Sequence, residues 1–137
     1  MADVKIIDID GEQWNIKDQA ARDRLEPIEN RNTTVFKEIT QGDVYLQMAK
    51  RNGIVDCFFR FRPMTAIAGQ TVTFEGVVPT GWKPAVPTRN QFVTNNDDTY
   101  KGQVVFRENG NIDIWSGVGN FVVGTDYSTN VVFICVD

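Results

Sequence analysis

The residues best suited to bind a ligand form a short polar stretch, Asn95-Asn96-Asp97-Asp98, followed by the aromatic ring of Tyr100. Amide and carboxylate oxygens suit Ca²⁺, but the stretch lacks the regular spacing and the terminal glutamate of an EF-hand loop. Asn and Asp also dominate ordinary turns, because their side chains bond the nearby backbone. We therefore expect no metal site here. These five residues are instead our candidates for contacting an organic ligand, by hydrogen bonding and by stacking.

Aromatic rings with polar tips point to the class of ligand. Sugar-binding surfaces stack such rings on the apolar faces of sugars, while amides and carboxylates hold the hydroxyl groups. The alternative for each ring is a place at the rim of the core or in a subunit interface. Trp82, between Gly81 and Lys83-Pro84, is expected to be structural, and Tyr100 is the best candidate for ligand contact.

The sequence argues against an enzyme. The chain contains no histidine, which removes the commonest general base, the usual nucleophile pairs and most zinc sites. Glycoside hydrolysis needs two paired carboxylates, but Asp113 and Glu75 each read as the solvent side of a half-buried strand. We expect no catalytic residues and no cofactor.

From Gly42 onward the pattern is that of β-structure. Asn52-Gly53 and Asn109-Gly110 each separate two runs of alternating apolar and polar residues, which is the strongest short-range signal for a hairpin. Further short strands are expected around Thr71–Phe74, Gln91–Thr94 and Phe121–Val123, with a loop over residues 95–99. Short strands without helical crossovers predict an all-β protein, an antiparallel β-sandwich of the jelly-roll type.

The first 40 residues have a different pattern. Residues 4–16 read as a hairpin around Asp10-Gly11, and Asp18 caps a helix that Pro27 ends, with Leu25 and Ile28 at helical spacing. So short a helix is not stable alone. We expect residues 1–40 to form an N-terminal hairpin, short helix and linker for attachment or trimerisation, and residues 41–137 to form the sandwich head.

The last strand is apolar on both sides. Val131, Phe133 and Cys135 point one way, and Val132, Ile134 and Val136 point the other. Antiparallel sheets of soluble proteins normally wet one face, so the second face needs an apolar cover. A neighbouring copy of the chain is a better candidate than the short helix. The residues expected at an oligomer interface are Val132, Phe133, Ile134, Val136, Leu25 and Ile28.

The two cysteines, Cys57 and Cys135, each lie on an apolar strand. We favour two buried, reduced thiols. A disulfide remains open if their two strands pair.

Charge and hydropathy exclude some partners. The net charge is −4 and the pI is about 4.8, which disfavours binding to nucleic acid. No stretch approaches the roughly 20 apolar residues of a membrane helix, and no secretory signal is visible. We expect synthesis in a cytoplasm and no membrane insertion.

Several motifs resemble those of a known family. Pro79-Thr-Gly-Trp-Lys-Pro84, the hairpin Phe106-Arg-Glu-Asn-Gly-Asn-Ile-Asp-Ile114 and the closing apolar strand resemble the C-terminal head domains of tail-fibre and baseplate receptor-binding proteins of tailed bacteriophages. The start, Ile7-Asp-Ile-Asp-Gly-Glu-Gln-Trp-Asn-Ile-Lys-Asp18, is similar to the N-termini of small phage structural proteins.

The resemblance implies a trimer of jelly-roll-like heads that binds host cell-surface saccharide. It also implies assembly with other tail or baseplate proteins in a virion, after synthesis in the host bacterial cytoplasm. The short helix and Pro27 depart from the long coiled coil of a fibre, so a compact baseplate, tail-tip or accessory piece is favoured. The alternative is a purely structural virion component that binds no glycan.

Overall fold

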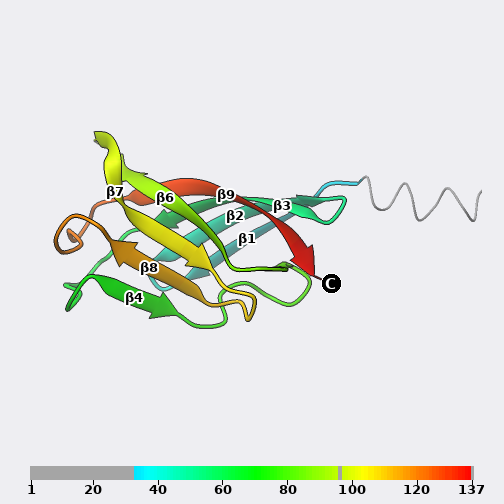
Figure 1. Cartoon of the computed structure of the whole chain (residues 1–137), viewed down its shortest axis with the longest axis horizontal. Coiled ribbons are helices and arrows are strands. Elements are labelled where there is room, and N and C mark those ends of the chain that lie inside the picture. Colours follow the sequence, from blue (N-terminus) through cyan, green and yellow to red (C-terminus); the bar gives the residue numbers. More distant parts are fainter. Residues whose placement is uncertain (1–32, 96, 137) are drawn as a thin grey trace, which may run out of the picture. The chain divides into compact units, whose positions relative to one another are not determined.

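A computed structural model describes residues 33–95 and 97–136 of the chain. The strands are antiparallel throughout and form one curled sheet in the order β1-β2-β3-β9-β6-β7-β8-β4, with β5 beside β9 (Figure 1). The strand bounds are β1 Val35–Gln41, β2 Val44–Arg51, β3 Ile54–Phe61, β4 Thr71–Phe74, β5 Lys83–Pro84, β6 Thr88–Thr94, β7 Asp97–Phe106, β8 Ile112–Ser116 and β9 Tyr127–Val136. The predicted all-β, antiparallel class is confirmed. The predicted N-terminal hairpin and helix lie outside the described residues.

The sheet curls around a core on its inner face. Phe61 on β3 and Phe74 on β4 lie far apart in the strand order, yet their ring centroids are 5.7 Å apart. Phe59 on β3 likewise meets Phe106 on β7, at 6.2 Å. These contacts close the curl, because side chains from distant strands fill its interior. The fully buried large residues are Phe59, Phe61, Phe92, Phe106, Leu46, Met48, Ile112, Ile114, Val44, Val55, Val78 and Val104.

Both predicted Asn-Gly hairpins are present. Asn52 and Gly53 join β2 to β3 with φ angles of 57° and 75°, the left-handed pair that a two-residue hairpin turn requires. Asn109-Gly110 lies in the turn between β7 and β8, where Arg107 N donates to Asn111 O at 2.9 Å. The chemistry of these turns is local, and sequence therefore predicted it.

Three local expectations were wrong. The sheet begins with β1 at Val35, inside the segment assigned to the N-terminal attachment region. The loop expected over residues 95–99 is shorter, because β7 already begins at Asp97. Phe121–Val123 is not a strand. Phe121 packs in the core, and Val122 N donates to Tyr127 Oη at 2.8 Å, so this backbone turns instead of pairing in the sheet.

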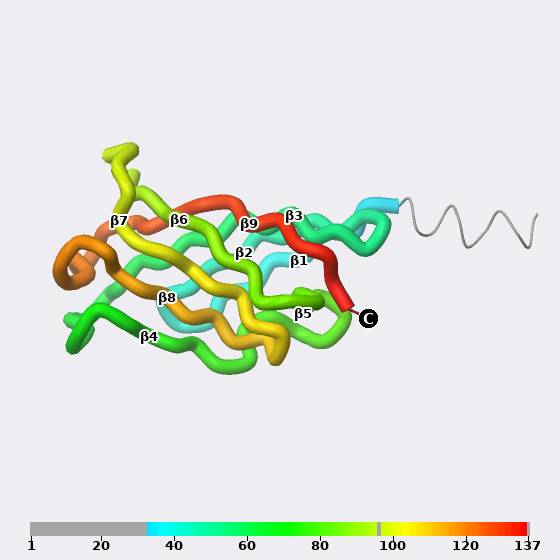
Figure 2. Tube along the Cα trace, in the orientation of Figure 1, coloured from blue at the N-terminus to red at the C-terminus, as the bar shows by residue number. Residues whose placement is uncertain are grey.

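The proline-rich passage fills the end of the curl near the C-terminal strand (Figure 2). Val77, Val78 and Trp82 are buried there, and Val78 N donates to Gly110 O at 3.0 Å. Lys50 holds the passage in place. Its Nζ donates to Gly81 O at 2.6 Å and lies 4.6 Å from the centre of the Trp82 ring. Trp82 is thus part of the core, as its sequence context predicted.

Among residues 33–95 and 97–136, no helix has the length and apolar character needed to cross a bilayer.

Candidate functional site: a polar hollow beside the β6–β7 hairpin

The predicted polar stretch forms the tip of the β6–β7 hairpin. Asn95 lies in the turn, Asp97 and Asp98 begin β7, and Asn96 is outside the described residues. Asp97 accepts hydrogen bonds from Lys101 Nζ at 2.9 Å and from Thr99 N at 3.0 Å. These bonds stabilise the carboxylate and lower the pKa of Asp97 from 3.8 to about 2. Asp97 is therefore ionised at neutral pH and tied to the base of its own hairpin.

Tyr100 packs against a neighbouring strand end. A Cβ atom built on Gly117 would lie 2.7 Å from the Tyr100 ring, so the missing side chain of Gly117 makes room for it. Gly117 N also donates to Lys101 O at 2.8 Å, which fixes the two backbones together. The Tyr100 side chain keeps 38% of its surface exposed. One part of the ring is covered by the chain, and the rest faces solvent.

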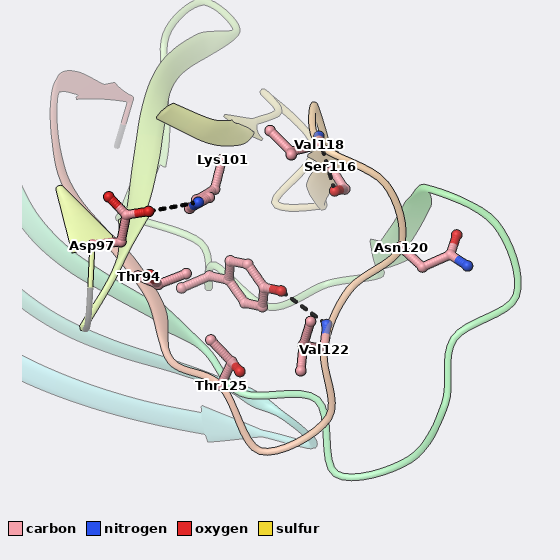
Figure 3. A pocket seen from close by; sticks show the side chains of 9 residues that line it. Thr94, Asp97, Lys101, Ser116, Val118, Asn120, Val122 and Thr125 are labelled. Atoms are coloured by element: carbon pink, nitrogen blue, oxygen red, sulfur yellow. Dashed lines mark hydrogen bonds and ion pairs between the residues drawn. The ribbon is translucent and has the colours of Figure 1, made fainter. Parts of the chain in front are cut away.

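A hollow of about 290 Å³ lies beside the hairpin (Figure 3). Its walls come from the end of β6, the start of β7, and the loop that joins β8 to β9. The lining residues are Thr94, Asp97, Lys101, Ser116, Val118, Asn120, Val122, Thr125 and Tyr127. Four of the five residues that sequence reasoning selected are described by the structure, and of these four only Asp97 lines this hollow. The short Gly-rich run Ser116-Gly-Val-Gly-Asn120 was the signal that could have pointed to it.

Internal hydrogen bonds hold the walls of the hollow. Ser116 Oγ donates to Gly119 O at 2.6 Å and accepts from Val118 N at 3.4 Å, which shapes the loop. Tyr127 Oη accepts from Val122 N at 2.8 Å, which anchors the loop to β9. Tyr127 is only 4% exposed, so it forms the base of the hollow. The loop is therefore shaped by its own contacts before any ligand arrives.

Metal binding and acid–base chemistry find little support here. Within the described part of the chain, no group of three or more Cys, Asp and Glu residues is placed to hold a metal ion. The one carboxylate of the hollow has a lowered pKa, whereas a general acid or base needs a pKa near neutrality. The Asp97 carboxylate can accept hydrogen bonds from a ligand in its ionised form.

A second notable surface lies on the outer face of β3 and β9. Val132, Ile134 and Val136 expose 57%, 67% and 52% of their surface. Ile54, opposite Ile134 in the register, exposes 48%. Phe36 on β1, at 76%, lies on this same outer face, through the pairs Phe36↔Ala49 and Ala49↔Asp56. We call these five residues the apolar outer face.

The expected interface set is divided by the structure. Val132, Ile134 and Val136 belong to the apolar outer face. Phe133 points the other way, is 5% exposed, and stacks near Phe106 with centroids 5.6 Å apart. Its assignment to an interface is corrected, because the core already covers its ring. Leu25 and Ile28 lie outside the described residues.

The cysteines do not pair. β3 and β9 are neighbours, but Cys57 lies opposite Val131, four residues before Cys135. At about 3.3 Å per residue the two positions are about 13 Å apart, whereas a disulfide needs Cα atoms within about 7 Å. Both thiols are free. Burial, followed by the nearby charge of Asp56, raises the pKa of Cys57 to about 12.

Comparison of the chain with known protein families and with curated protein sequences finds no match.

Proposed function

We propose that the chain is one subunit of a homotrimeric tail-associated protein of a bacteriophage, whose heads attach to saccharide on the host cell surface. The motifs described under Sequence analysis suggest the family, and they lie at the Trp82 turn, the β7–β8 hairpin and β9. The observation that carries the proposal is the apolar outer face, because residues 33–95 and 97–136 of a single chain leave it in water.

The strand pairing supports a reduced jelly roll. β3 pairs with β9 and β4 pairs with β8, as in a long hairpin whose two arms are wrapped together. β6 and β7 then pair with β9 and β8, inside that wrap. A jelly roll nests its strand pairs in this way. We infer that the head is a jelly roll with fewer strands than the usual eight, preceded by the β1–β2 hairpin.

The apolar outer face favours a second copy of the chain as its cover. Five large apolar residues gathered on one sheet face are more than the scattered exposed residues of a monomer. A hollow of about 380 Å³ lies beside them, lined by Thr34, Ala49, Arg51, Asn52, Ile54 and Asp56. Ile134 is exposed beside this recess. The Ile134 side chain of one copy can therefore insert into the recess of the next copy. Head-to-tail contacts generate a ring when the rotation between copies closes and a filament when it does not; a trimer is the smallest such ring, and we propose this closed form.

The two ends of the described unit suit different tasks. The start of β1 and the end of β9 lie together at one end, and the β6–β7 tip and the β8–β9 loop lie at the other (Figure 2). An adhesion head needs this polarity, with attachment at one end and ligand contact at the other. The apolar outer face belongs to the attachment end, since it includes Phe36 at the start of β1 and Val136 at the end of β9.

The test is the absolute mass of the full chain in solution, by light scattering on a sizing column. We expect three times the chain mass of 15.5 kDa. Ile134→Asp should yield monomers, because it would bury an unpaired charge in the contact. Val123→Asp is the matched control, since Val123 is 49% exposed but outside the apolar outer face. A monomeric wild-type chain, or a trimer that survives Ile134→Asp, would overturn the proposed assembly.

A purely structural virion component is the alternative. It shares the trimer and the outer face, and differs only in binding no saccharide. Pull-down of the intact oligomer with host cell-wall material separates the two: retention supports adhesion, and recovery of all the protein in the unbound fraction supports the structural role.

A further inference from the structure

We propose that the hollow beside the β6–β7 hairpin binds one neutral sugar unit within a single chain. This inference rests on the proposed function, and it moves the binding site away from the hairpin tip. The new site uses the polar groups of Thr94, Asp97, Asn120 and Thr125, which line the hollow together with Tyr127 at its base.

Size and position limit what the hollow can hold. Small-molecule sites are usually about 300–1,000 Å³, so a volume of about 290 Å³ lies at the lower limit and suits one small unit of a larger molecule. The lining residues of the hollow come from the β6–β7 tip and the β8–β9 loop. Figure 2 shows these two segments at the end of the sheet opposite the start of β1 and the end of β9. The hollow therefore stays accessible when the attachment end is covered.

Charge excludes a strongly ionic ligand. Two lining residues are charged, Asp97 and Lys101, and they neutralise each other at 2.9 Å (Figure 3). No net charge remains among the lining residues to attract a phosphate, an acidic sugar or an amine. Asp97 remains useful to a neutral ligand, because each of its carboxylate oxygens has a further lone pair that can accept from a hydroxyl group.

The remaining polar groups match a ligand rich in hydroxyls. Among the described residues, the side chains of Thr94, Asn120 and Thr125 have no hydrogen-bond partner, and all three line the hollow. Together they offer two hydroxyls and one amide, each able both to donate and to accept. Tyr127 Oη already accepts from Val122 N, which leaves its own proton free to donate. Sugar hydroxyls also donate and accept, so each of these side-chain groups can form a hydrogen bond with a sugar hydroxyl.

Apolar groups complete the match. Val118 and Val122 line the hollow, and they expose 56% and 59% of their surface in total. Sugars carry apolar C–H faces between their hydroxyls, and aliphatic and aromatic side chains cover such faces in binding sites. A small, purely polar ligand would leave both valines in water, whereas a sugar ring can cover them.

The test is NMR titration of the isotope-labelled full chain with glucose, galactose, N-acetylglucosamine and rhamnose, and with N-acetylneuraminic acid as the charged control. We expect at least one neutral sugar to shift the amide signals of residues 116–127 and of Thr94, with no shift from the acidic sugar. Asn120→Ala should weaken that binding about fivefold, as loss of one hydrogen bond does. Thr125→Val should act similarly while preserving shape.

Asp98→Ala is the matched control, since Asp98 is exposed at the hairpin tip and outside the hollow, and it should leave the affinity unchanged. Loss of binding in Asp98→Ala, shifts confined to residues 95–100, or no shift with any neutral sugar would overturn the inference. Thermal unfolding of each variant shows whether it remains folded. The mass measurement keeps the two proposals separate: a trimer that binds no sugar contradicts the hollow alone, and a sugar-binding monomer contradicts the trimer alone.

Discussion

Ile54 on β3 and Ile134 on β9 are direct partners in the sheet register, and both leave about half or more of their surface in water, 48% and 67%. A cross-strand pair of β-branched residues is stabilising where it is packed, but here nothing in the described chain lies over it. One residue earlier on β9, Phe133 is in the core. Of these two adjacent residues of β9, Phe133 packs in the core and Ile134 lies on the exposed face. Mutation of each residue can therefore separate the two contributions.

Phe133→Ala should destabilise the fold, and Ile134→Ala should not. Phe133 fills core space beside Phe106, so its truncation should lower the free energy of unfolding by about 3–5 kcal/mol. Ile134 is exposed, so within a single chain its truncation should change that energy by less than about 0.5 kcal/mol. Denaturant unfolding at concentrations low enough to dissociate any oligomer measures both. Equal losses would mean that the two faces of β9 are equally covered.

Asp97 should titrate near pH 2. Its folded pKa of about 2 lies below the ordinary 3.8, so the stabilisation from its bonds is fully present above about pH 4. It is lost as the pH falls through 2. Carbon-detected NMR of the side-chain carboxyl gives the midpoint directly. Lys101→Met should raise the midpoint toward the ordinary value, because the hydrogen bond from Lys101 contributes most to the lowered pKa of Asp97. An unchanged midpoint in that variant would contradict the ion pair.

Gly102→Ala should disrupt the sheet. A Cβ at Gly102 would lie 2.0 Å from Trp115 O and 2.6 Å from the Phe92 ring, and the backbone oxygen cannot move without opening the β7–β8 ladder. We expect a loss of about 3 kcal/mol or more in the free energy of unfolding.

Gly53→Ala is the comparison for that change. No atom lies within 4 Å of its Cβ position, but its φ is +75°, so the expected loss is only about 1 kcal/mol, from backbone strain. Thermal melts of the two variants should therefore differ clearly, and similar melting temperatures would contradict the close packing at Gly102.

Cys57 should resist thiol reagents in the folded protein. Its buried thiol has a pKa of about 12, so almost no thiolate exists at pH 8. Cys135 is half-buried and free, and should react more readily. Mass spectrometry after brief labelling, with and without denaturant, counts the modified sites. Cys135→Ser should then take up no label until it is unfolded. Labelling of native Cys135→Ser would show that the β3–β9 ladder opens.

Sequence predicted the parts of this fold that depend on local chemistry. The Asn52-Gly53 turn follows from the tolerance of both residues for positive φ, and the two sides of β9 follow from the alternation of a strand. Which side of β9 faces the core did not follow, because both sides are apolar. Phe133 was therefore placed at an interface together with its outward neighbours.

The hollow was not predictable for a different reason. Its lining comes from the β6–β7 hairpin and from the loop before β9, about 20 residues apart, and the curl of the sheet brings them together. The prediction of a strand over Phe121–Val123 was wrong for a related reason. Three apolar residues in a row are typical of a strand, yet the core takes only Phe121, and the bond from Val122 N to Tyr127 fixes a turn.

The position of β9 also sets the order in which this protein can fold. Of the described strands β9 is synthesised last, yet it lies in the middle of the sheet, between β3 and β6. Until it arrives, β1–β3 and the β6–β8 strands have no shared partner and expose the core side chains that β9 will cover. Pairing between β3 and β9 spans most of the chain, and such distant contacts form slowly. A chain that lacks the residues from Tyr127 onward would thus remain two unjoined, aggregation-prone pieces, and only chains that include β9 would become competent to assemble.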